Sequence, residues 1–83
     1  MRVEIEDWKN GWAGVRVALS LGEIDVFIQR LTMLKNDPEQ HFHISSDNKG
    51  SGGVGDIEIY VKGPNDTDNM FLSSRAMQPG EEI

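Results

Sequence analysis

Two alternating segments that flank one glycine-rich loop constrain this chain more than any other feature. Residues 41–46 (HFHISS) and 56–62 (DIEIYVK) alternate polar and apolar side chains, which is typical of strands with one covered face. Between them lies a polar segment with four glycines, residues 47–55 (DNKGSGGVG), whose composition indicates a connection rather than a third strand. The second half of the chain therefore predicts an antiparallel hairpin.

The same loop spells G-x-G-x-x-G over residues 50–55, the pattern of a dinucleotide-binding turn. That function needs a helix directly after the glycines, because the helix N-terminus holds the pyrophosphate. Ile57, Ile59 and Val61 instead follow at a period of two, which predicts a strand. We therefore interpret the loop as a flexible hairpin connection and not as a nucleotide site.

A second hairpin is predicted near the amino terminus, where residues 1–6 and 13–19 also alternate. A two-residue turn would place Ile5 opposite Arg16 and mix a covered face with a polar one. A three-residue loop, residues 9–11, instead pairs Ile5 with Val15 and keeps apolar side chains together. Gly11 can supply the positive φ that such a loop requires, so we predict this register. The remaining apolar pairs are then Val3 with Val17 and Met1 with Leu19.

This register places Trp8 directly opposite Trp12, on the face that carries Glu4 and Arg16. Opposed aromatic side chains stabilise the end of a hairpin. Large aromatic side chains on a polar face are also typical of the centres of protein interfaces. Both interpretations stay open from the sequence alone.

A single helix is predicted between the two hairpins. Ser20 and Glu23 have the spacing of a capping box, and Asp37-Pro38 ends the helical pattern. The apolar side chains between them recur at helical spacing: Ile24, Phe27, Ile28, Leu31 and Leu34. We thus predict one α+β domain over residues 1–83, an antiparallel four- or five-stranded sheet of order β-β-α-β-β-(β) with the helix packed on one face. Residues 69–74 are the candidate fifth strand, and residues 78–83 are expected to be a frayed tail.

Composition narrows the classes of function. The 83 residues carry a net charge of −6, which disfavours nucleic-acid binding and favours a basic partner. The chain has no cysteine, no signal-peptide pattern and no apolar run long enough to span a membrane, so we expect a cytoplasmic protein without membrane contact. No nucleophile motif is present, and so small a chain has little room for a substrate pocket. We expect no catalytic residue, no cofactor and no enzymatic activity.

Two imidazoles and a carboxylate share one predicted sheet face. His41 and His43 are two residues apart on one strand, and Glu58 lies on the same face of its neighbour, beside Tyr60. These groups are zinc ligands in many proteins, but the H-x-H spacing also occurs on ordinary solvated strands. A metal- or small-ligand-binding domain that uses His41, His43 and Glu58 is therefore our alternative hypothesis.

Residues 41–46, the glycine-bearing loop and residues 57–61 (IEIYV) resemble the small bacterial immunity-protein-like families of polymorphic toxin systems. The resemblance implies a cytoplasmic protein that neutralises a toxin by binding it, and it implies no catalytic residue. Our leading hypothesis is accordingly a small acidic, non-enzymatic protein-binding domain. Its partner would be another protein or a second copy of the chain. The partner-binding residues would be Trp8, Trp12, His43, Glu58 and Tyr60.

Overall fold

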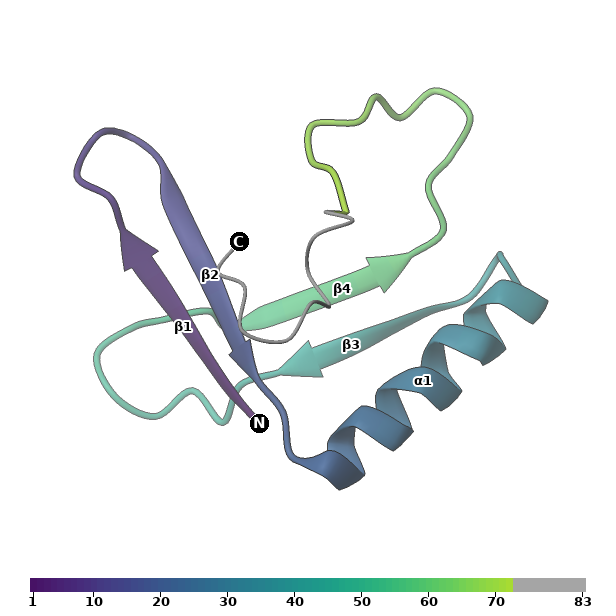
Figure 1. Cartoon of the computed structure of the whole chain (residues 1–83), viewed down its shortest axis with the longest axis horizontal. Helices are drawn as coiled ribbons and strands as arrows, with labels where there is room; N and C mark the ends of the chain where they lie inside the picture. Colours follow the sequence, from purple (N-terminus) through teal and green to yellow (C-terminus); the bar gives the residue numbers. More distant parts are fainter. Residues whose placement is uncertain (73–83) are drawn as a thin grey trace, which may run out of the picture.

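The computed structural model describes residues 1–72 and contains one helix and four strands (Figure 1). In chain order these are β1 (Arg2–Asp7), β2 (Ala13–Ala18), α1 (Leu21–Asn36), β3 (His41–Ser45) and β4 (Asp56–Tyr60). The α+β class and the predicted order of the strands and helix along the chain are confirmed. The strands form two sheets rather than the single sheet that was predicted.

The first hairpin has the register that the alternation predicts. β1 and β2 are antiparallel, with Ile5 opposite Val15 and Val3 opposite Val17. The Trp8 N–H donates to the Trp12 carbonyl at 3.2 Å, which closes a three-residue loop over residues 9–11. Gly11 has a φ of +91°, the left-handed geometry that favours glycine. The three-residue turn is thus confirmed. The predicted pairing of Met1 with Leu19 falls beyond the ends of the ladder.

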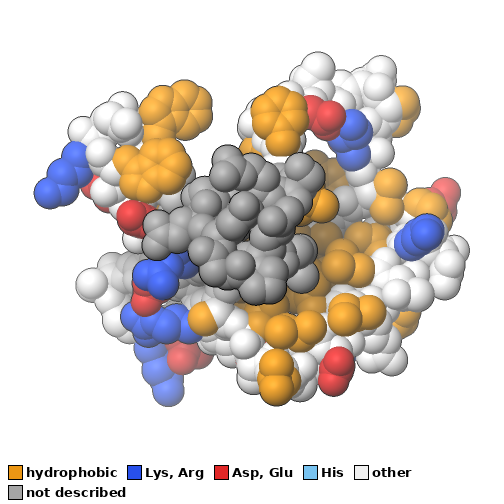
Figure 2. Space-filling view, viewed as in Figure 1, with side chains coloured by type: hydrophobic (Ala, Val, Ile, Leu, Met, Phe, Trp, Pro, Cys, Tyr) orange, Lys and Arg blue, Asp and Glu red, His pale blue; other side chains and the backbone are white. Residues whose placement is uncertain are grey.

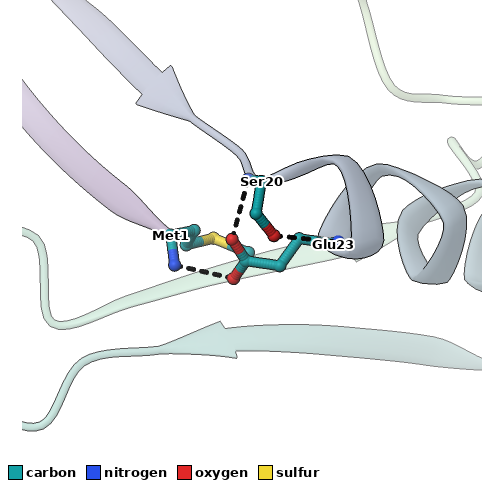
Figure 3. Close-up of polar contacts among 3 residues, drawn as sticks. All are labelled: Met1, Ser20 and Glu23. Atoms are coloured by element: carbon teal, nitrogen blue, oxygen red, sulfur yellow. Dashed lines mark hydrogen bonds and ion pairs between the residues drawn. The ribbon is translucent and has the colours of Figure 1, made fainter.

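Helix α1 begins at a complete capping box (Figure 3). The Glu23 backbone N–H donates to the Ser20 hydroxyl at 3.1 Å, and the Ser20 N–H donates to the Glu23 carboxylate at 3.0 Å. The amino-terminal ammonium of Met1 also donates to Glu23, at 2.6 Å. This ion pair joins the base of the first hairpin to the start of α1. At the other end, the Asp37 N–H donates to the Met33 carbonyl, immediately before Pro38.

The second hairpin packs on the helix. β3 and β4 are antiparallel, with His43 opposite Glu58 and Phe42 opposite Ile59. The apolar positions of this hairpin are half-buried, and the Phe27 ring of α1 meets the Phe42 ring edge to face, with centroids 5.7 Å apart. Figure 1 shows α1 running alongside β3. The glycine-rich segment joins β3 directly to β4, as predicted, and the Ser46 N–H donates to the Gly55 carbonyl across its base.

The predicted single sheet is not found in residues 1–72. β1 pairs with β2 and β3 pairs with β4, giving two separate two-stranded sheets. Alternation within a strand specifies which side chains share a face, but it carries no information on which edges of distant hairpins join. Residues 69–72 of the candidate fifth strand are not in a strand. Residues 73 and 74 and the predicted frayed tail, 78–83, lie outside the described residues.

Few side chains of the described residues are removed from solvent. Leu34 of α1, at 8% exposure, is the one buried side chain in residues 1–72. A two-stranded sheet is too narrow to cover a helix, so Ile28 and Val26 of α1 remain more than half exposed. Figure 2 shows hydrophobic side chains at the surface over the outer end of the β1–β2 hairpin and on the side where α1 lies. Within the described residues no helix has the length and apolar character needed to cross a membrane.

Candidate functional site

The outer end of the β1–β2 hairpin carries both tryptophans of the chain. They lie opposite each other at the turn, as the register predicts, and are 54% (Trp8) and 73% (Trp12) exposed. The Trp8 indole lies over Gly14 of β2, and its Cζ2 atom is 3.1 Å from the position that a Cβ would occupy there. Trp8 therefore packs within the hairpin, and Trp12 projects more freely. The structural role that the sequence suggested fits Trp8 better than Trp12.

The opposite face of the same hairpin is also exposed. Ile5, Val15 and Val17 keep 55%, 60% and 46% of their surface in contact with solvent. A hairpin with one covered face would hide one of these two sets of side chains. We call the two sets together the hairpin surface, which consists of Ile5, Trp8, Trp12, Val15 and Val17.

Charges on the first hairpin are balanced. Three acidic and three basic side chains lie between residues 2 and 16: Glu4, Glu6 and Asp7, with Arg2, Lys9 and Arg16. The hydrogen bond and the charge of Arg2 lower the pKa of the Glu4 carboxyl, with a further contribution from Arg16 across the ladder, 3.7 Å away. The net charge of −6 consequently arises outside this hairpin.

A groove opens between the base of the first hairpin, α1 and the second hairpin. It encloses about 660 Å³. Apolar side chains from all three elements line it, among them Val3, Phe27, Phe42 and Ile57. In a compact domain such side chains would fill the space between the layers. These side chains therefore line an open groove rather than a filled core.

On the second hairpin, the polar side chains form a connected cluster on the face away from the half-buried apolar positions. The His41 and His43 rings meet edge to face, with centroids 5.0 Å apart. His43 lies directly opposite Glu58. One possible ligand atom from each of His41, His43 and Glu58 lies within 4.8 Å of the other two, and all three side chains are exposed. The structure thus brings together the three residues of the predicted metal set.

Two further residues complete this cluster. The His43 Nδ1 atom is 2.8 Å from the Asp56 carboxylate, and the Ser45 hydroxyl donates to the other oxygen of Asp56, also at 2.8 Å. The hydrogen bond to Asp56 raises the pKa of His43, and those from His43 and Ser45 lower the pKa of Asp56. The serine bonds to the aspartate rather than to the histidine, so this is not the arrangement of a hydrolase triad.

Ser45 and Asp56 were not among the residues predicted for this site. Their positions were nevertheless implied by the register: if His43 is opposite Glu58, then Ser45 is opposite Asp56, on the same face. The predicted partner-binding residues are divided by the structure. Trp8 and Trp12 lie on the first sheet, whereas His43, Glu58 and Tyr60 lie on the second.

No protein-family model, curated protein or solved structure matches this chain. Function is therefore inferred from the hairpin surface and from the polar cluster of the second hairpin.

Proposed function

We propose that the protein is a non-enzymatic protein-binding domain that inserts its first hairpin into a cleft of a basic partner protein. The observation that carries the proposal is the exposure of both faces of the β1–β2 hairpin, Ile5 and Val15 on one side and Trp12 on the other. An isolated two-stranded hairpin is marginally stable in water, so enclosure by a partner would stabilise it.

Enclosure on two sides distinguishes this surface from a flat interface. A partner that covered only the tryptophan face would leave Val15, 60% exposed, and Val17, 46% exposed, in contact with solvent. Removal of such side chains from water contributes about 25 cal/mol per Å² of apolar surface. A cleft that contacts both faces removes apolar surface from water on each of them. The two tryptophan indoles lie at the turn and would therefore be the side chains deepest in the cleft.

Charge supports a partner that differs from the chain itself. The hairpin is neutral, and the remainder of the chain carries the net charge of −6. A second copy would bring like charge close to that remainder, whereas a cleft with a basic rim would be attracted to it. A toxin is the partner that the resemblance to immunity proteins suggests, and it is the first to test.

Site-specific photocrosslinking in cells that make the protein tests this proposal. A photoreactive residue is placed at position 12, at position 15 on the opposite face, or at position 21 as a control. Leu21 is also highly exposed, at 83%, but it lies at the start of α1 and outside the hairpin surface. We expect one and the same basic protein to be captured from positions 12 and 15 and not from position 21.

The purified partner then allows an affinity measurement. Trp12→Ser should weaken binding by about 30-fold or more, the effect of losing an interface residue worth about 2 kcal/mol. Leu21→Ser should leave the affinity unchanged, and the attraction should weaken as salt is added. Capture from only one hairpin face, equal capture from position 21, or crosslinks only between copies of the chain would each contradict the proposal.

A further inference from the structure

We propose that the polar face of the second hairpin binds a divalent transition metal of the zinc class through His41, His43 and Glu58. This site is on a different sheet from the hairpin surface and rests on different observations. It can therefore be correct or wrong independently of the proposed protein-binding function.

The geometry of the three side chains suits such an ion. Their ligand atoms lie within 4.8 Å of one another. Around tetrahedral zinc, with bonds of about 2.0–2.2 Å, neighbouring ligand atoms are roughly 3.4 Å apart. The remaining difference is small, and the exposed side chains of His41 and Glu58 can close it by changing rotamer while His43 keeps its bond to Asp56. The β3–β4 ladder fixes their backbones, because His43 is directly opposite Glu58 and His41 is two residues along the same strand.

Asp56 supplies the support that metal-binding histidines typically have. Its carboxylate lies 2.8 Å from His43 Nδ1, so the other ring nitrogen, Nε2, is the one available to a metal. The Ser45 hydroxyl holds the second oxygen of Asp56 at 2.8 Å. A carboxylate that bonds the far nitrogen of a ligand histidine fixes its tautomer and ring orientation and makes it a stronger donor. Asp56 and Ser45 are thus positioning residues rather than ligands.

The ligand types select the class of ion. Two imidazoles and one carboxylate favour zinc and the neighbouring transition metals over calcium and magnesium, which prefer oxygen ligands. Three protein ligands leave at least one coordination position for water or an anion. Because the three side chains are exposed, that position faces solvent.

The chain offers an unusually direct measurement, because it contains only two histidines and both belong to the site. We would follow their imidazole C–H signals by NMR in tag-free protein while Zn²⁺ is added near neutral pH, and determine the affinity by competition with a chromophoric chelator. We expect both histidines to respond together and to saturate at one ion per chain.

Single substitutions distinguish the metal ligands from the residues that position them and from neighbouring residues that take no part in binding. His41→Ala, His43→Ala and Glu58→Gln should each abolish saturable binding. Asp56→Asn should weaken it about 10- to 100-fold, as is usual when the support of a ligand histidine is lost. Tyr60→Phe is the matched control, since Tyr60 is exposed on the same face opposite His41, and it should bind as the unmodified chain does.

Circular dichroism of each variant checks that the fold is retained. Absence of any histidine response at a several-fold excess of Zn²⁺ would overturn the proposal. Unchanged affinity in His43→Ala or Glu58→Gln would overturn it as well, because it would show that the ion binds elsewhere. Equal losses in Asp56→Asn and Tyr60→Phe would show that Asp56 has no positioning role.

Discussion

The two hairpins have similar sequence patterns and very different surroundings. Both alternate polar and apolar side chains, and both are antiparallel pairs of short strands. On β3–β4 the apolar face is half-buried, with Phe42 against the Phe27 ring of α1, and the polar face holds a hydrogen-bonded network. On β1–β2 most side chains of both faces are exposed, and on the apolar face only Val3, near the base, is half-buried. The comparison shows that alternation decides which side chains share a face, whereas distant parts of the chain decide whether that face is covered.

The largest expected difference between covered and uncovered regions is in the free energy of unfolding that is lost when an apolar side chain is truncated. Leu34→Ala removes the one buried side chain of residues 1–72 and should lower the free energy of unfolding by about 2–3 kcal/mol. Val15→Ala, at a site that is 60% exposed, should lower it by less than about 0.5 kcal/mol. Denaturant unfolding measures both changes. Similar costs at the two sites would show that the first hairpin is also packed in the free protein.

The turn of the first hairpin provides the next test. Gly11 has a φ of +91°, so Gly11→Val should destabilise the hairpin by about 1 kcal/mol or more. Gly52→Val is the control, because Gly52 lies in the second loop, has no positive φ of this kind and has open space around it. Tryptophan fluorescence during unfolding reports on this hairpin, since both indoles lie beside the turn. Equal stability of the Gly11→Val protein and the unmodified chain would contradict the three-residue loop.

A smaller, pH-dependent effect is expected where the first hairpin meets the helix. The hydrogen bond from the Met1 ammonium, followed by those from Ser20, lowers the pKa of Glu23 from its ordinary 4.5 to about 2. A lowered carboxyl pKa stabilises the fold fully above the unfolded-state value of 4.5, and this contribution is lost as the pH falls toward about 2. The unfolding free energy should decline over that interval.

Glu23→Gln isolates this contribution from those of the other carboxyl groups. The difference in unfolding free energy between the two proteins should be constant between pH 4.5 and neutral pH and should shrink as the pH falls from 4.5 to about 2. A difference that is independent of pH over this interval would show that the ion pair does not form in solution.

Local features could be predicted from the sequence because their causes lie within a few residues. The Ser20–Glu23 capping box, the Gly11 turn and the pairing of Ile5 with Val15 each depend on side chains close together in the chain. The His41–His43–Glu58 cluster was predictable for a similar reason, since hairpin register alone brings it together. Extending that register by two residues would also have identified Ser45 and Asp56.

Long-range arrangement could not be predicted in this way. Nothing in the alternation of residues 1–6 indicates whether β1 or β2 should pair with β3 or β4. The prediction of a single sheet therefore assumed, without evidence from the sequence, that an edge strand of one hairpin pairs with an edge strand of the other. The predicted partner-binding residues were grouped together on the same assumption of a single sheet. Trp12 and Tyr60 would share a face only in a continuous sheet, and the structure places them on separate ones.

The central claim is that the first hairpin is uncovered in the free protein while the second is held by the helix. Amide hydrogen exchange of the isolated monomer tests it directly, because exchange reports the local opening of each hairpin. We predict that backbone amides of β3, β4 and α1 exchange measurably more slowly than those of β1 and β2. Addition of a partner that encloses the hairpin surface should then slow exchange in β1 and β2. Protection of β1 and β2 equal to that of β3 and β4 in the isolated monomer would contradict the account.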